Sequence, residues 1–301
     1  MQASKNTIIG ILFVALVVLV GIMFLIKQPS PEPEVALEPE PQAVIQSVPT
    51  STQAVIGTSV EGRDIEVYRF GTGDTQLLFV GGVHGGYEWN SVLLAYEFID
   101  YFSRNHSLIP KDISVAIIPN LNPDAIYEAT GREGRFEASD VVTDASLRAA
   151  ARFNANDVDL NRNFDCKWQP ESTWRGNPVS AGTAAFSEPE AAALRDYVTE
   201  AQPDAVIFWH SQADTVYASE CEAGVIPETL EIMDAYAAAA NYKTQATFDA
   251  YPITGDAEGW LASIGIPAIT VEFKSHESMD WTQNLRGVSA LLNYYQAKLA
   301  R

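Results

Sequence analysis

Histidine and glutamate side chains lie at three points of this 301-residue chain where apolar strands are predicted to end. These residues are His84 with Glu88, then His210, then Glu272. Imidazole nitrogens and carboxylate oxygens are ligands that zinc prefers, and a separation of four residues can place His84 and Glu88 on one side of a helical turn. A histidine beside glycines is often only a turn residue, so the prediction of a divalent-metal site depends on the three points together.

A loop rich in arginine and amide side chains, residues 152–164 (RFNANDVDLNRNF), lies between the first two of these points. Its arginines, Arg152 and Arg162, could bind a carboxylate through two hydrogen bonds or stabilise an oxyanion. Composition alone also allows a solvated loop in which arginine and aspartate pair with each other.

The elements that must position these residues alternate along the chain. We predict strands at residues 54–57, 64–70, 76–80, 113–118, 204–209 and 268–271, and helices at 88–102, 187–200, 227–241 and 284–300. Most strands are continuous apolar runs, which is typical of a sheet covered on both faces, and ligands of such sheets bind beyond the carboxyl ends of the strands. We therefore predict an α/β fold with a mixed, mostly buried β-sheet sandwiched by helices.

Two local patterns complete this assignment. Ser187 precedes an acidic helix start, Glu188-Pro189-Glu190, and is predicted to be the N-cap of that helix. Residues 127–160 are polar and contain several arginines, and we predict a loop there.

The N-terminal residues differ from the rest of the chain. Residues 7–26 form an uninterrupted apolar run between two lysines, long enough for a transmembrane helix, and no small-residue cleavage site follows it. We predict a membrane anchor at residues 1–27, a Pro/Glu-rich stalk at 28–50 and a globular domain at 51–301. A short tail before a large acidic domain favours a single-pass protein with this domain outside the cytoplasm.

Charge and cysteine content narrow the partners and the compartment. The formal net charge of -20 argues against nucleic acid and anionic lipid as partners, because both require a basic surface. The two cysteines, Cys166 and Cys221, are compatible with one disulfide in an oxidising compartment or with a pair of buried thiols.

Residues 51–301 resemble the zinc carboxypeptidases of the carboxypeptidase A type, the M14 metallopeptidase family. Residues 158–164 (VDLNRNF) are similar to the most specific signature of that family. Residues 80–90, 209–211 and 270–272 resemble further family segments and follow in the expected order.

The resemblance implies a site for one zinc ion. His84, Glu88 and His210 would be its three ligands, with a fourth position left for water, and Asp159 would hold the second ring nitrogen of His84. Three residues separate His84 from Glu88, whereas the family usually has two, so Glu88 is where this sequence departs from the family pattern.

The resemblance also implies catalytic and substrate-binding residues. Glu272 would be the general base, and Arg152 would polarise the scissile carbonyl and stabilise the oxyanion. Asn161 and Arg162 would bind the free C-terminal carboxylate of a peptide substrate, over which Tyr251 would close.

A pocket for the terminal side chain is implied at Glu258, with Asp256 nearby. An acid there would favour a basic terminal residue, although a surface loop of an acidic protein is the alternative. A disulfide between Cys166 and Cys221 would join two loops of the implied site. His276 is predicted to be a loop residue beside this site.

The predicted function is that of a membrane-anchored zinc metallocarboxypeptidase, a hydrolase that removes C-terminal residues from peptides. One alternative is a zinc amide hydrolase that acts on peptidoglycan stem peptides or N-acyl amino acids. Another is a non-catalytic binding module that has kept the fold. The presence of Asn161, Arg162 and Tyr251 favours the carboxypeptidase, because these residues would recognise an amino acid with a free carboxylate.

Overall fold

The computed structural model describes residues 51–301, which correspond to the predicted globular domain. The membrane helix predicted at residues 7–26 and the stalk predicted at 28–50 lie outside the described residues. Within residues 51–301, no helix combines the length and the apolar character that crossing a bilayer requires.

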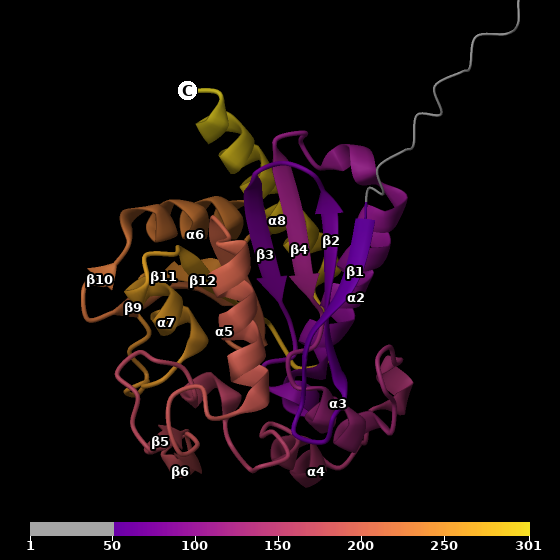
Figure 1. Cartoon of the computed structure of the whole chain (residues 1–301), viewed down its shortest axis with the longest axis vertical. Coiled ribbons are helices and arrows are strands. Elements are labelled where there is room, and N and C mark those ends of the chain that lie inside the picture. The colour runs from indigo at the N-terminus through magenta and orange to yellow at the C-terminus, as the bar shows by residue number, and fades with distance from the viewer. Residues whose placement is uncertain (1–50) are drawn as a thin grey trace, which may run out of the picture. The chain divides into compact units, whose positions relative to one another are not determined.

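An eight-stranded mixed sheet crosses this domain (Figure 1). Its strands follow the spatial order β1 (Ser51–Thr58), β2 (Asp64–Gly71), β4 (Ile113–Ile118), β3 (Thr75–Val80), β7 (Ala205–Ser211), β12 (Ala268–Phe273), β8 (Thr215–Ala218) and β11 (Lys243–Gln245). The four central strands β4, β3, β7 and β12 run parallel, and their neighbours β2 and β8 run antiparallel to them. The carboxyl ends of the central strands therefore meet at one edge of the sheet.

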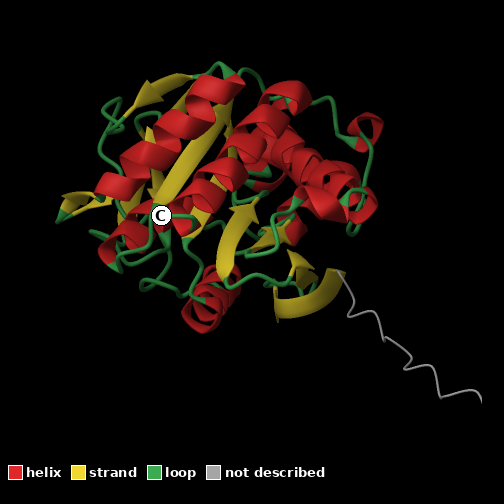
Figure 2. Ribbon diagram, turned by 90° about the horizontal axis from the view of Figure 1, so that it is seen from above, coloured by secondary structure: helices red, strands yellow, loops and turns green. Residues whose placement is uncertain are grey.

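Helices cover both faces of the sheet, as Figure 2 shows from above. On one face lie α2 (Trp89–Arg104), α6 (Pro227–Ala240) and α8 (Trp281–Leu299), and on the other lie α5 (Pro189–Ala201) and α7 (Ala257–Ser263). Along β3, Leu77 and Phe79 pack in the first hydrophobic cluster, whereas Leu78 and Val80 pack in the second. This alternation is what a strand buried on both faces requires. The predicted α/β sandwich is confirmed for the described residues.

Shorter elements connect the strands and the longer helices. They are the 3₁₀ turns η1 (Gly85–Glu88), η2 (His106–Leu108), η3 (Ala138–Asp140) and η4 (Leu160–Arg162), the helices α3 (Pro123–Thr130) and α4 (Ala145–Ala150), and the short strands β5 (Glu171–Trp174), β6 (Asn177–Ser180), β9 (Glu220–Cys221) and β10 (Gly224–Val225). β5 and β6 form a separate antiparallel hairpin.

The loop predicted at residues 127–160 is wrong in part, because α3 extends into this range and α4 lies within it. Both helices begin at a polar N-cap. The side chain of Asn122 accepts from the backbone of α3, and that of Asp144 accepts from the backbone N–H groups of Ser146 and Leu147. These caps stabilise helices in a stretch whose polarity alone favoured a loop.

The N-cap predicted at Ser187 is also wrong. Helix α5 begins at Pro189 with Glu188 in the N-cap position, and no side chain caps it. The hydroxyl of Ser187 instead donates to the carboxylate of Glu188 at 2.8 Å and accepts from Asn163 Nδ2 at 3.0 Å. These contacts tie the start of α5 to the loop that precedes the hairpin.

Candidate metal site and active-site cleft

The carboxyl edge of the parallel strands brings the predicted chemical residues together. β7 lies between β3 and β12, and the register of β12 pairs Glu272 with His210. Glu272 belongs to β12 itself, so the strand extends beyond its predicted end at residue 271. Two of the three predicted points are thus neighbours on adjacent strands.

The glycine-rich turn after β3 supplies the third point. Gly85 has a positive φ of 42°, and a Cβ atom on Gly85 or Gly86 would lie 2.3 Å from the methyl group of Ala125 or Ala129 in α3. Only glycine allows the turn to lie this close to α3. These two glycines begin η1, which directs Glu88 back towards His84.

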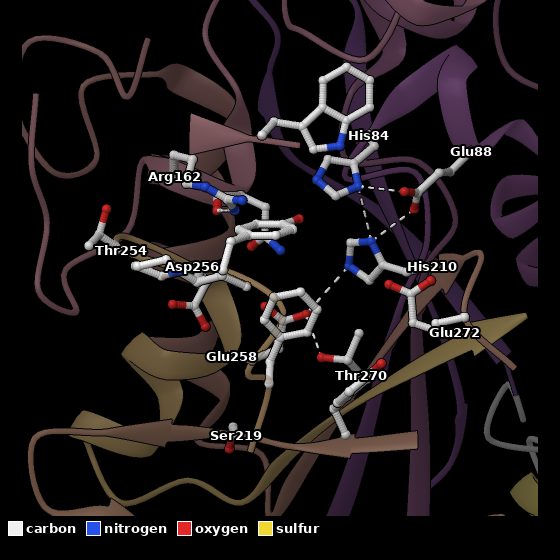
Figure 3. A pocket seen from close by; sticks show the side chains of 18 of the residues that line it. His84, Glu88, Arg162, His210, Ser219, Thr254, Asp256, Glu258, Thr270 and Glu272 are labelled. Carbon is white, nitrogen blue, oxygen red and sulfur yellow. Dashed lines mark hydrogen bonds and ion pairs between the residues drawn. The ribbon is translucent and has the colours of Figure 1, made fainter. Parts of the chain in front are cut away.

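His84, Glu88 and His210 form a buried group of three potential ligands (Figure 3). Nδ1 of His84 lies 2.9 Å from one carboxylate oxygen of Glu88, and Nδ1 of His210 lies 2.9 Å from the other. The two Nδ1 atoms are 3.1 Å apart. The extra residue between His84 and Glu88 therefore does not separate their side chains. Two imidazole nitrogens and a carboxylate facing one another are a donor set that fits zinc.

Asp159 connects the first histidine to an arginine. One of its oxygens lies 3.5 Å from Nε2 of His84, and the other accepts from Nε and Nη2 of Arg152 at 3.0 and 2.9 Å. Burial opposes the charge of Asp159, but Arg152 and Arg162 hold its pKa well below the usual value. Arg152 also places Nη1 3.8 Å from Glu88, so its guanidinium is fixed beside the metal ligands.

Glu258 contacts the second histidine. Its carboxylate lies 3.4 Å from Nε2 of His210 and accepts from the hydroxyl of Thr270 at 3.0 Å. The sequence prediction placed Glu258 at a pocket floor and missed both contacts. Thr270 lies two residues before Glu272 and hence on the same face of β12. This spacing could have identified Thr270 as a residue of the site.

Glu272 directs an unpaired carboxylate oxygen into the site. Its Oε2 atom is buried and has no hydrogen-bond partner among residues 51–301. Burial raises the pKa of Glu272 to about 8, and the neighbouring charge of Glu88 contributes to this shift. A carboxyl group with a pKa near neutrality is suited to proton transfer.

A cavity of about 570 Å³ opens at this edge of the sheet. It brings together almost all of the residues that the sequence predicted for the site: His84, Glu88, Arg152, Asn161, Arg162, Cys166, His210, Tyr251, Asp256, Glu258 and Glu272. Asp159 is fully buried behind His84. Cys166 and Cys221 form a disulfide, which joins the loop after η4 to β9.

One end of the cavity contains amide, arginine and carboxyl groups. Arg162 donates to the carbonyl oxygens of Asn161 at 2.6 Å and Thr173 at 3.2 Å, and its buried Nε atom has no partner in the described part of the chain. Asn161 accepts from the backbone N–H of Ala257 at 2.9 Å. Asp256 caps α7, and burial together with Glu258 raises its pKa to about 6.

The β5–β6 hairpin covers part of the cavity and was not predicted. The ring of Trp174 lies 4.6 Å from the guanidinium carbon of Arg152 and 5.1 Å from the ring of Tyr87. Of the turn pair Arg175-Gly176, only the glycine is a usual hairpin signal, because asparagine or aspartate typically precedes it, so the sequence indicates this turn only weakly. His276, predicted as a loop residue, lies 2.8 Å from the hydroxyl of Ser211, next to His210.

Comparison with known proteins identifies a family. The zinc carboxypeptidase family (Peptidase_M14) matches residues 41–295. The human carboxypeptidase N catalytic chain is 32% identical over 122 residues, 36% of this chain and 25% of that relative. The inactive metallocarboxypeptidase ECM14 of Arthroderma otae is 27% identical over 166 residues, 49% of this chain and 26% of that relative. The chain thus spans about a quarter of the length of these curated relatives.

Solved structures show the same fold. Bovine thrombin-activatable fibrinolysis inhibitor, in complex with tick carboxypeptidase inhibitor, superposes with a TM-score of 0.65 at 19% identity, covering 83% of this chain and 92% of that chain. The murein-tripeptide amidase MpaA from Escherichia coli O157 gives a TM-score of 0.57 at 24% identity, covering 84% of this chain and 95% of that chain. At these identities the likeness shows the fold alone.

Proposed function

The chain belongs to the zinc carboxypeptidase family, and we propose that it hydrolyses the last peptide bond of peptides that carry a free C-terminal carboxylate. Zinc is the cofactor of this family, and His84, Glu88 and His210 form the group that can hold it. The observation that carries the proposal is one cavity lined by these three side chains, by Glu272 and by Arg152.

The chain's own residues account for the chemical roles around the metal. When bound, zinc supplies Lewis acidity that activates water and polarises a carbonyl. Glu272 takes a proton from the attacking water and returns it to the leaving amine, since its free carboxylate oxygen faces the site. Arg152, held by Asp159, stabilises the negative charge that develops on the carbonyl oxygen.

Asn161 and Arg162 bind the terminal carboxylate in this proposal. Both line the cavity, and Arg162 is held by carbonyl oxygens that leave its positive charge without a carboxylate partner among residues 51–301. Tyr251 lines the same cavity and closes over the bound residue. We therefore propose that this end of the cavity binds the C-terminal residue of the substrate through its free carboxylate.

The terminal side chain occupies the part of the cavity lined by Asp256, Glu258 and Thr270. Two carboxyl groups at this position favour a cationic side chain, because a buried carboxylate requires a positive partner. We propose a preference for basic terminal residues. Figure 3 shows both acids beside the cavity and Glu258 directed towards His210.

Two other functions remain candidates because specific observations are compatible with them. A murein-tripeptide amidase, 95% of whose chain is covered, has this fold, so the fold also accommodates an amide hydrolase acting on peptidoglycan stem peptides or N-acyl amino acids. The similarity to a relative named inactive favours a binding module. Glu272 and Arg152 within the cavity argue against loss of catalysis.

We propose that the predicted anchor at residues 7–26 holds the enzyme in a membrane with its catalytic domain outside the cytoplasm. The Cys166–Cys221 disulfide supports this location, because disulfides persist in oxidising compartments. Cleavage of the domain by protease added to intact cells would support it, and protection until lysis would contradict it.

The test of the activity uses the zinc-loaded full-length protein and N-blocked dipeptides ending in Arg, Phe or Glu. Each peptide is supplied as the free acid and as the terminal amide. We expect chelator-sensitive release of Arg from the free acid, little release from the amide, and a loss of about 10²- to 10⁴-fold in kcat for Glu272→Gln. Turnover of peptidoglycan stem peptides without turnover of the dipeptides would transfer the assignment to the amide hydrolase. No turnover of either substrate would favour the binding module.

A further inference from the structure

Strand β5 contacts residues at both ends of the cleft. Ser172 contacts the hydroxyl of Thr254 at 3.1 Å, the carbonyl of Thr173 accepts from Arg162 at 3.2 Å, and Trp174 lies over Arg152. Successive residues of β5 therefore meet the proposed terminal-carboxylate end first and the proposed scissile-carbonyl position next. The following residue, Arg175, lies one step further upstream along a bound peptide.

Arg175 differs from the other arginines of the cavity in its partners. Arg152 is bonded to Asp159, and Arg162 is bonded to two carbonyl oxygens. Arg175 lines the cavity and is exposed, and within residues 51–301 it forms neither an ion pair nor a side-chain hydrogen bond. Its guanidinium carbon lies 5.4 Å from the ring of Trp174, which supports the arginine without neutralising its charge.

The surroundings of Arg175 form a small polar and aromatic site beside the metal ligands. The rings of Tyr87 and His276 lie 4.5 Å apart, and Tyr87 immediately precedes Glu88. Burial lowers the pKa of His276, and the positive charge of Arg175 lowers it further. Tyr87 and Arg175 both contact Trp174, the ring of Tyr87 at 5.1 Å and the guanidinium carbon of Arg175 at 5.4 Å. Arg175 therefore lies on the same side of the cleft as Tyr87 and His276.

We propose that Arg175 binds a carboxylate on the substrate within two residues upstream of the scissile bond, so that the enzyme prefers acidic residues there. The inference rests on the proposed function, because the direction of the bound peptide follows from the roles of Arg162 and Arg152. In a chain of net charge -20, Arg175 gives an anionic substrate group a favourable electrostatic contact at the upstream end of the cleft.

The test compares N-blocked peptides that end in the same basic residue and differ only in Glu or Gln at the first or second upstream position. For the zinc-loaded full-length protein, we expect kcat/KM to be about tenfold higher for Glu at one of these positions, and the preference to shrink as salt is added. Arg175→Gln should reduce the Glu/Gln ratio to about one, and Arg175→Lys should restore part of it.

Lys167→Gln is the matched control, because Lys167 lines the same cavity, next to Cys166, and is likewise exposed. This variant should keep the Glu/Gln ratio of the unmodified protein. A ratio of one in the unmodified protein, or a ratio unchanged in Arg175→Gln, would overturn the inference while leaving the proposed function intact. If no peptide is hydrolysed, the proposed function fails. Calorimetry then decides the inference, by comparing the affinities of the Glu and Gln peptides for the unmodified protein and for Arg175→Gln.

Discussion

The carboxylate of Glu258 lies 3.4 Å from Nε2 of His210, on the side of the ring opposite the nitrogen that faces Glu88. Asp159 has the same relationship to His84, at 3.5 Å from Nε2. Each imidazole of the metal group therefore has a carboxylate behind it. Such a carboxylate fixes the orientation and the tautomer of a metal-binding histidine. Glu258 consequently supports the metal site in addition to lining the proposed side-chain pocket.

Substitution of Glu258 should weaken zinc binding. We expect Glu258→Ala to raise the zinc dissociation constant by about 10- to 100-fold, and Glu258→Gln to have a smaller effect because its amide oxygen can still face Nε2 of His210. Competition with a chromophoric chelator measures this constant independently of activity. Asp256→Asn is the matched control, because Asp256 lines the same pocket but does not contact His210. Equal zinc affinity in Glu258→Ala and the unmodified protein would limit Glu258 to substrate binding.

Zinc binding should release a proton from His210. Burial lowers the pKa of this histidine, but Glu88 and Glu258 raise it well above the usual value, so the metal-free ring keeps its proton to a higher pH than an ordinary histidine. Zinc requires the neutral ring, and its binding therefore displaces this proton and weakens as the pH falls. Calorimetric titration of zinc in buffers of different ionisation enthalpy measures the number of protons released. Glu272→Gln removes any proton that Glu272 would release when zinc binds, so the titration is made in this variant as well. An enthalpy that does not depend on the buffer would show that no proton is released.

The strand ends predicted that His84, His210 and Glu272 converge, and the resemblance to zinc carboxypeptidases then assigned Glu88 as a ligand and Glu272 as the base. The carboxyl ends of parallel strands meet at one edge, so His84 and His210 were expected to converge. The distance between Glu88 and His84 was less certain from spacing alone, since it depends on the close packing of Gly85 and Gly86 against α3. The packing partner α3 was itself predicted only in part, because its last residues lie in the predicted loop at 127–160.

The direction of Glu258 and the role of the hairpin could not be predicted. Glu258 lies in the first turn of α7, a short helix that was not predicted, and its contact with His210 depends on how α7 packs on the sheet. Trp174 and Arg175 belong to a hairpin outside the main sheet. Their positions follow from tertiary contacts with Arg152 and Tyr87, which no local pattern encodes.

Loss of the disulfide should destabilise the domain. Cys166 and Cys221 are separated by 55 residues, and closing a loop of this length is expected to contribute about 4 kcal/mol through the entropy of the unfolded chain. The double substitution Cys166→Ser, Cys221→Ser should lower the free energy of unfolding by this order, as measured by urea denaturation. The unmodified protein under reducing conditions should approach the same value. Equal stability of the oxidised and reduced proteins would contradict the prediction.

The raised pKa of Glu272 should make the stability of the metal-free domain depend on pH. Its pKa is about 8 in the folded protein and near 4.5 in the unfolded chain, so folding favours the protonated carboxyl group. The contribution of this group is fully present below about pH 4.5 and is lost as the pH rises towards 8. Glu272→Gln keeps a neutral group at every pH. The Tm of Glu272→Gln should therefore equal that of the unmodified protein near pH 4.5 and exceed it at pH 8. Each kcal/mol of difference in the free energy of unfolding corresponds to about 2–4 °C in Tm.

The exposed residue Glu277 provides the control, because the Tm of Glu277→Gln should not diverge from that of the unmodified protein as the pH rises. Bound zinc should narrow the difference, since its positive charge favours the ionised carboxylate. Parallel Tm curves for Glu272→Gln and the unmodified metal-free protein would show that Glu272 ionises normally in the folded state.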